Sequence, residues 1–120
     1  MTTPQIIAHR GASYLAPENT LVAFRKAMEI GADGVEMDVQ KTYDNELVIH
    51  HDYMVDMHTD ISGQIYYLTM GELKALDFGS WKDAIYANER IATLQEALEL
   101  CASMEGTQVQ LELKLSLIHI

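Results

Sequence analysis

Short apolar runs alternate along this chain with stretches in which apolar residues recur at helical spacing. The first run, residues 6–8, reaches His9 and breaks at Gly11, which predicts a buried strand with polar residues at its carboxyl end. Further strands are predicted at residues 34–39, 47–50 and 109–113.

Helices are predicted between these strands. Residues 17–20 open the first helix with Asn19 as its N-cap, and Gly31 stands where a helix-ending glycine belongs. Residues 69–72 and 93–96 both have the form Thr-x-x-Glu, the capping box that opens a helix. In the last helix, apolar residues at the spacing of one helical face are Leu94, Ala97, Leu98 and Cys101.

The order strand, helix, hairpin, helices, strand is the opening of a parallel α/β protein. Residues 53–90 are too long for an ordinary connection between two elements of such a fold. We therefore expect an insertion there, with a helix of its own.

Composition narrows the class of protein without revealing its chemistry. The chain has 120 residues, 48% of them hydrophobic, and a net charge of −10, so it can bury one modest core. Its eight Lys and Arg are scattered, which argues against a nucleic-acid partner. No run reaches the roughly 18 apolar residues that span a bilayer, and the start lacks a secretory signal pattern. The single cysteine, Cys101, excludes an intrachain disulfide, so we expect a soluble, cytoplasmic protein.

Carboxylates lie two residues apart on a predicted strand. Because side chains alternate along a strand, Glu36 and Asp38 share one face of an otherwise apolar run. Buried together, they would repel unless a cation joined them, and oxygen ligands suit Mg²⁺ or Ca²⁺. The alternative is a solvated strand face. Glu112 and Lys114 repeat the spacing, which by itself is typical of a surface pair.

His9 and Arg10 form a second candidate group. A histidine at a strand end is most often structural, but Arg10 beside it and Gly11 after it fit a turn that faces a phosphate. Taken alone, the pair indicates little.

The histidines at the end of the third strand depend on the hairpin register. If Asp44-Asn45 is a two-residue turn, His51 lies opposite Asp38, on the face of the carboxylates, and His50 faces away as a structural residue. A register shifted by one residue would exchange the two histidines.

Together these residues favour metal-assisted hydrolysis of a phosphate ester, with the charged groups at the strand ends where barrel enzymes carry their sites. They fit nucleophilic catalysis poorly. No Gly-x-Ser-x-Gly is present, and Cys101 lies on the apolar stripe of a predicted helix.

The order and spacing of several motifs resemble the glycerophosphodiester phosphodiesterases. The motifs are Ala-His-Arg-Gly-Ala at 8–12, Pro-Glu-Asn-Thr at 17–20, Gly-Val-Glu-Met-Asp-Val at 34–39, His51-Asp52, Leu-Asp-Phe-Gly-Ser-Trp at 76–81 and Leu-Glu-Leu-Lys at 111–114. The resemblance implies a TIM (β/α)₈ barrel with a small inserted subdomain. It also implies hydrolysis of glycerophosphodiesters to sn-glycerol 3-phosphate and an alcohol.

The resemblance assigns roles at matching positions. The metal ligands would be Glu36, Asp38 and Glu112, for one divalent cation, Ca²⁺ or Mg²⁺. The general acid and base would be His9 and His51, and the phosphate-binding residues Arg10 and Lys114. Two readings stay open beside this one: a lysophospholipase D-like member of the same superfamily, and a non-catalytic fragment. The oligomeric state is left open.

Some segments depart from the family pattern. Residues 55–59 read Val-Asp-Met-His-Thr where the family usually has Leu-Asp-Arg-Thr-Thr, and Ala92 replaces a usual proline. We expect residues 1–114 to be a partial barrel with residues 53–90 as the insertion. Residues 115–120 resemble a translated sequencing adapter, and we expect a non-native tail there. A barrel needs about 200 residues or more, so we expect the chain alone to be inactive.

Overall fold

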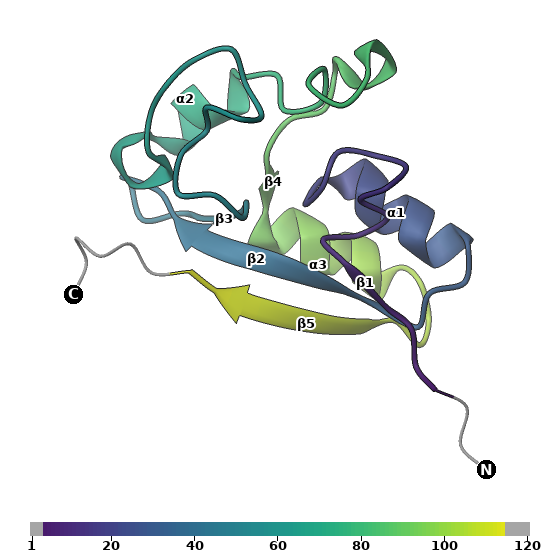
Figure 1. The fold of residues 1–120 in the computed structure, drawn as a ribbon. Helices are drawn as coiled ribbons and strands as arrows, with labels where there is room; N and C mark the ends of the chain where they lie inside the picture. Colours follow the sequence, from purple (N-terminus) through teal and green to yellow (C-terminus); the bar gives the residue numbers. More distant parts are fainter. Residues whose placement is uncertain (1–3, 115–120) are drawn as a thin grey trace.

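The computed structural model describes residues 4–114, which form one mixed sheet covered by helices (Figure 1). The strands are β1 (Ile7–His9), β2 (Gly34–Lys41), β3 (Leu47–Ile49), β4 (Ala92–Thr93) and β5 (Gln108–Leu113). β1 and β5 pair in parallel with β2 on its two edges, because both pair with the same residues of β2. β3 pairs antiparallel with the far end of β2, and β4 pairs with β3. The predicted α/β class is confirmed.

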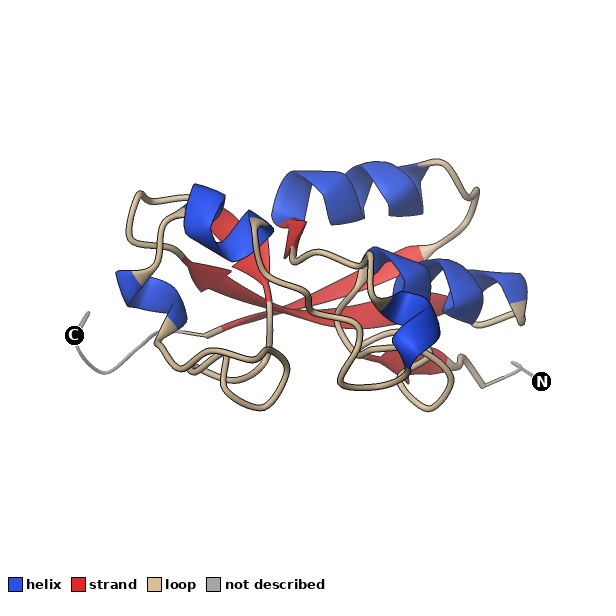
Figure 2. Ribbon diagram, turned by 90° about the horizontal axis from the view of Figure 1, so that it is seen from above, coloured by secondary structure: helices blue, strands red, loops and turns tan. Residues whose placement is uncertain are grey.

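The helices follow the predicted order. They are α1 (Leu21–Glu29), α2 (Met70–Lys74) and α3 (Leu94–Ala102), with short 3₁₀ helices η1 (Ile65–Tyr67) and η2 (Ala84–Tyr86). Both predicted capping boxes are present, at Thr69 and Thr93. Figure 1 shows the helices on one side of β2 and β5, and Figure 2 shows the same helices and strands from above. Within residues 4–114, no helix is long and apolar enough to span a membrane.

The start of α1 corrects one expectation. Thr20, not Asn19, is the N-cap, and its hydroxyl accepts a hydrogen bond from the Ala23 N–H at 3.3 Å. Thr20 has the extended backbone that an N-cap needs, whereas Asn19 has φ 57° and uses its side chain elsewhere. Gly31 follows the helix with φ 96°, as predicted for a terminating glycine.

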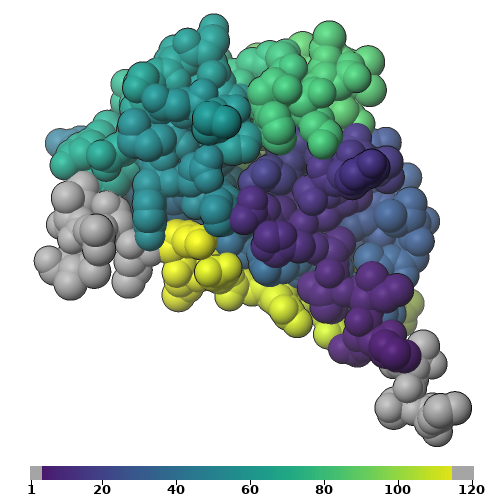
Figure 3. Space-filling view, viewed as in Figure 1, coloured from purple at the N-terminus to yellow at the C-terminus, as the bar shows by residue number. Residues whose placement is uncertain are grey.

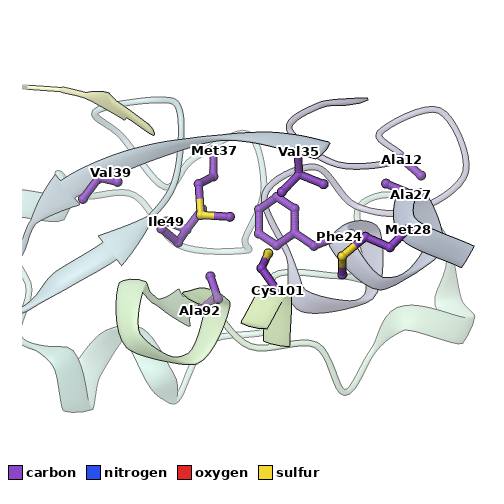
Figure 4. Packing of buried hydrophobic residues seen from close by; sticks show 11 residues of the cluster. Ala12, Phe24, Ala27, Met28, Val35, Met37, Val39, Ile49, Ala92 and Cys101 are labelled. Atoms are coloured by element: carbon purple, nitrogen blue, oxygen red, sulfur yellow. The ribbon is translucent and has the colours of Figure 1, made fainter. Parts of the chain in front are cut away.

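The main core lies between β2 and the two longer helices. Val35 and Met37 of β2 lie close to the Phe24 ring of α1, and Val39 lies farther along the strand beyond Ile49 (Figure 4). All of them belong to one buried cluster that also contains Cys101 of α3. This burial fixes which face of β2 the helices cover. Its alternate residues, Glu36 and Asp38 among them, therefore point to the opposite face.

One residue of the predicted apolar stripe of α3 lies outside this core. Ala97 and Cys101 are buried, but Leu98 remains 39% exposed beside Leu47 at the edge of the sheet. The helix packs on the sheet through a narrower face than its apolar spacing predicts.

The segment 53–90 contributes to a second apolar cluster. This cluster contains Val48, Val55, Ile65, Leu73, Phe78 and Ile91. Because Val48 belongs to β3 and Ile91 precedes β4, the segment packs on that end of the sheet. Its status as an inserted subdomain stays a prediction.

The turn between β2 and β3 has three residues, so the predicted two-residue turn is wrong. The Thr42 N–H donates to the Glu46 carbonyl at 2.8 Å, which leaves residues 43–45 as the turn. Asn45 adopts φ 65°, a left-handed conformation that asparagine tolerates and that three-residue hairpin turns use.

The longer turn shifts the predicted register by one residue. Val39 pairs with Ile49, and the His50 N–H donates to the Asp38 carbonyl at 2.9 Å. His50 and not His51 therefore stands opposite Asp38. β3 ends at Ile49, so strand alternation no longer decides where the side chains of the next two residues point.

β5 is the least covered strand. Among the described residues it pairs with β2 alone, and Leu111 and Leu113 are 45% and 71% exposed. The predicted non-native tail at residues 115–120 lies outside the described residues.

Candidate active site

Three carboxylates meet on the face of the sheet opposite α1 and α3. Glu36 and Asp38 lie on β2, and Glu112 lies on β5 directly beside Asp38 in the parallel register. One carboxylate oxygen of each lies within 4.8 Å of the others. The predicted convergence is confirmed, and the role of these groups as metal ligands stays a prediction.

The burial of these carboxylates is uneven. Asp38 is completely buried, the Glu36 side chain is 23% exposed, and that of Glu112 is 53% exposed. Among the described residues, Asp38 Oδ1 and Glu36 Oε1 are buried without a hydrogen-bond partner. Such oxygens are costly to desolvate, and a cation would satisfy both. The all-oxygen donor set fits a hard divalent ion such as Mg²⁺ or Ca²⁺.

Asn19 holds the other oxygen of the most buried carboxylate. Its Nδ2 donates to Asp38 Oδ2 at 3.0 Å, and its Oδ1 accepts from the Asp38 backbone N–H at 3.3 Å. Asn19 was expected to be the N-cap of the helix, and this contact with Asp38 was not predicted. The Asn-Thr pair offered a signal, because Thr20 can cap the helix and leave the amide free.

A tight turn after β1 brings the Arg10 side chain next to Asp38. Arg10 has φ 59° and Gly11 φ 81°, and a Cβ on Gly11 would lie 2.7 Å from the Ala23 carbonyl carbon. Arg10 Nε lies 3.6 Å from Asp38 Oδ2, and Nη1 donates to Glu18 Oε2 at 3.0 Å. The guanidinium is thus held between two carboxylates.

Glu18 is a site neighbour that the sequence reasoning did not single out. Contact with His58 and the Arg10 guanidinium lower the pKa of Glu18 to about 2, although burial acts in the opposite direction. The carboxylate is therefore ionised throughout the neutral range, and it fixes Arg10 by charge as well as by hydrogen bonding.

Two further predicted residues contact the carboxylates directly. His9 Nε2 lies 3.4 Å from Glu36 Oε1, and Lys114 Nζ lies 3.3 Å from Glu112 Oε1. Both contacts arise because His9 and Lys114 stand at the carboxyl ends of β1 and β5. These two strands flank β2 in parallel, so their carboxyl ends lie on the same side of the sheet.

His51 is bound differently. Its Nδ1 lies 2.8 Å from Asp52 Oδ1, and its ion-pair contact is with that residue rather than with the carboxylate cluster. Gln40 of β2 holds the backbone on either side, because its Nε2 donates to the His50 carbonyl at 2.8 Å and to the Asp52 carbonyl at 2.6 Å. Gln40 is a further residue whose contact was not predicted from the sequence.

His50, interpreted from the sequence as structural, is buried beside the second cluster. Its ring packs edge-on against the rings of His58 and Phe78, with distances between ring centroids of 4.9 Å and 5.4 Å. Burial, with the neighbouring His58, lowers the pKa of His50 to about 4. A neutral, packed imidazole is the form that this position requires.

The space-filling view shows residues from distant parts of the sequence on one face (Figure 3). The purple N-terminal segment, the teal part of the segment 53–90 and the yellow strand β5 lie together there. Three carboxylates, two of which keep a buried oxygen without a hydrogen bond, lie beside an arginine, a lysine and a histidine. Together these groups form a site suited to a cation and a phosphate group.

Comparison with known proteins agrees with this chemistry. Residues 9–119 match the glycerophosphoryl diester phosphodiesterase family. A glycerophosphodiester phosphodiesterase of Caldanaerobacter subterraneus is 45% identical over 113 residues, which cover 94% of this chain and 46% of that protein. The chain therefore belongs to the glycerophosphoryl diester phosphodiesterase family.

Solved structures show the same relationship. An Oleispira antarctica phosphodiesterase, solved with the product sn-glycerol-3-phosphate, is 47% identical with a TM-score of 0.89, over 92% of this chain and 44% of that one. The glycerophosphodiester phosphodiesterase of Agrobacterium tumefaciens is 34% identical with the same TM-score, over 94% of this chain and 48% of that one. The chain spans about half the length of the relatives that it matches.

Proposed function

We propose that this chain forms the N-terminal part of a metal-dependent glycerophosphodiester phosphodiesterase. The whole enzyme would release sn-glycerol 3-phosphate and an alcohol. Parallel strands β1, β2 and β5 would be consecutive strands of a TIM barrel, with residues 53–90 as an inserted subdomain. The parallel pairing of β2 with both neighbours and the helices on one face support this assignment.

The observation that carries the proposal is the carboxylate cluster. Glu36, Asp38 and Glu112 would hold one divalent cation, because two of their oxygens are buried and otherwise unsatisfied. Such an ion would polarise phosphate oxygens and lower the pKa of a bound hydroxyl. Either Mg²⁺ or Ca²⁺ accepts this set of ligands.

The cationic side chains would bind the phosphate. Arg10 lies against Asp38 and Lys114 against Glu112, so both positive charges would lie close to the cation position. Arg10 cannot be deprotonated and presents a planar set of donors that matches phosphate oxygens. Its contacts with Glu18 and Asp38 hold it in place before substrate binds.

The histidines would transfer protons. His9 is exposed and touches Glu36, so it can reach a phosphate ester bound at the cluster. His51 is oriented by Asp52, an arrangement that fixes which ring nitrogen carries the proton. We assign the two residues as the general acid and base pair and leave their order open.

The test is a hybrid enzyme. Residues 1–114 would be joined to the part of the Caldanaerobacter enzyme that lies outside the matched region, and hydrolysis of glycerophosphocholine would be measured with Mg²⁺ or Ca²⁺. Turnover that is lost on chelation and in an Asp38→Asn hybrid supports the proposal. A folded hybrid without metal-dependent turnover overturns it.

Two comparison samples sharpen this test. Lysophosphatidylcholine as substrate identifies a lysophospholipase D-like member if it is hydrolysed in preference to glycerophosphocholine. The 120-residue chain assayed alone should show no turnover. In the described residues β5 pairs on one edge only, so its apolar face and that edge lack the cover of further barrel strands and helices.

A further inference from the structure

His58, a residue of the segment 53–90, lies buried beside the candidate site. Its side chain is 9% exposed, and its ring packs edge-on against Trp81 at 4.5 Å and against His50 at 4.9 Å. Its Nδ1 is buried without a hydrogen-bond partner in the described residues. A buried imidazole with an unpaired nitrogen is costly unless nearby charges compensate it.

The two ring nitrogens of His58 face two different carboxylates. Nδ1 lies 3.8 Å from Asp52 Oδ2, and Nε2 lies 3.9 Å from Glu18 Oε1. Both distances exceed hydrogen-bond length, so each nitrogen is close to a carboxylate without being hydrogen-bonded to it. A protonated imidazole has an N–H on each side of its ring, which allows it to donate to two carboxylates.

Each of these carboxylates holds a residue of the proposed site with its other oxygen. Asp52 Oδ1 lies 2.8 Å from His51 Nδ1, and Glu18 Oε2 accepts from Arg10 Nη1 at 3.0 Å. His58 therefore stands at the middle of a continuous series of contacts. One branch leads to the proposed proton carrier and the other to the proposed phosphate-binding residue.

We propose that His58 is a positioning residue that orients His51 through Asp52 and Arg10 through Glu18. The proposal rests on the proposed function for the roles of His51 and Arg10. Asp52 is about one-third exposed, so without His58 its carboxylate would be free to turn toward water. His51 would then lose the acceptor that fixes its tautomer.

The competing explanation is that His58 only fills space between Trp81 and His50. Three variants separate the two explanations. His58→Phe keeps the aromatic ring and removes both nitrogens. His58→Asn keeps a donor near the Nδ1 position, facing Asp52, and His58→Gln keeps one near the Nε2 position, facing Glu18.

Kinetics of the hybrid enzyme give the first readout. We expect His58→Phe to lower kcat/KM by about 10–100-fold, the usual effect of losing a group that orients an active residue. His58→Asn should mainly raise KM, because the Arg10 branch is cut. His58→Gln should mainly lower kcat, because the His51 branch is cut. Trp81→Phe alters the packed ring and leaves the carboxylates untouched, so it should change neither constant.

The tautomer of His51 gives a readout that needs no activity. Above the imidazole titration, ¹⁵N shifts of the labelled 120-residue chain and of the hybrid should place the His51 proton on Nδ1, donated to Asp52. His58→Phe and His58→Gln should shift the proton toward Nε2, and His58→Asn should not.

The outcomes are distinguishable. An inactive hybrid would count against the proposed function, while the tautomer shift would still decide the role of His58. An unchanged tautomer in His58→Phe, or losses of kcat/KM in all three variants that merely follow their melting temperatures, would overturn the proposal. If the isolated chain gives no dispersed spectrum, the labelled hybrid supplies the same measurement.

Discussion

The two faces of β2 are built in opposite ways. Toward the helices, Val35, Met37 and Val39 are buried among apolar side chains and need nothing further. Toward the other face, Glu36 and Asp38 are also largely buried, yet each retains a buried oxygen without a hydrogen-bond partner. The same strand thus has one face that is fully packed and one on which two buried carboxylate oxygens have no hydrogen-bond partner.

This difference shows that burial, more than the number of acidic residues, makes the carboxylates a candidate metal site. Glu112, half exposed and paired with Lys114, would be satisfied by water in isolation. Asp38 beside it, with no exposed surface, would not. Exposed acidic groups are common, and the buried pair on β2 gives the third carboxylate its significance.

The largest expected effect comes from the two proposed proton carriers of the site, tested in the hybrid enzyme. Replacing His9 or His51 with Ala should lower kcat by about 10²–10⁴-fold, the range for a lost general acid or base. Melting temperatures should change little, because both side chains are at least partly exposed. Losses of only about ten-fold in both variants would place proton transfer elsewhere.

Substitutions on the apolar face of β2 should change the stability of the protein and not its catalytic activity. Met37→Ala in the hybrid should reduce the free energy of unfolding by about 2–5 kcal/mol, because it leaves a cavity under Phe24 and Ile49. Met37→Leu conserves volume and should cost less than about 1.5 kcal/mol. Denaturant unfolding measures both. Equal losses of unfolding free energy in the two variants would show that the packing around Met37 is looser than in the structure.

Cation binding should stabilise the protein through the carboxylates on the polar face of β2. With Ca²⁺ or Mg²⁺ at about 100 times its Kd, the hybrid should gain about 2.7 kcal/mol of stability. Asp38→Asn should abolish that gain, and Glu105→Gln, an exposed acid that makes the same change in charge, should keep it. A cation-induced shift that survives Asp38→Asn would mean that the ion binds elsewhere.

The convergence of the carboxylates was predictable from the sequence because it needs only two regularities. Side chains alternate along each strand, and parallel neighbours present their carboxyl ends together. Glu36 and Asp38 therefore had to share a face, and Glu112 joined them once β5 paired with β2. His9 and Lys114 followed from the same regularities.

The contacts that were not predicted from the sequence depend on the backbone conformation of single residues or on tertiary packing. The left-handed conformation of Asn45 lengthened the hairpin turn by one residue and moved the register. Asn19 gave its capping role to Thr20 because its amide reached Asp38. The contact between Glu18 and His58 joins segments separated by a helix and two strands, and no local pattern encodes it.

A smaller effect should come from the seam between β2 and β5. A Cβ on Gly34 would lie 2.4 Å from the Gln108 carbonyl oxygen, so Gly34→Ala must push the strands apart. We expect a loss of about 1–3 kcal/mol, with weaker cation binding because Glu112 moves away from Asp38. Gly71→Ala is the control, since its Cβ would meet only Thr69 Oγ at 4.0 Å. Unaltered cation affinity in Gly34→Ala would show that Glu112 is dispensable.

The smallest expected effect concerns Glu18 and appears only in acid. Its pKa is lowered from 4.5 to about 2 in the folded protein, through His58 and Arg10, so the ionised form is bound more tightly than in the unfolded chain. The stability that it contributes is therefore complete above about pH 5 and is lost as the pH falls toward 2. Glu18→Gln should cost about 1 kcal/mol at neutral pH, because the carboxylate is partly exposed and screened. Urea unfolding of the hybrid between pH 2 and 7 measures this, and the difference between the two proteins should vanish at the acid end. A difference that stays constant across the range would show that the contact with Arg10 does not depend on the charge of Glu18.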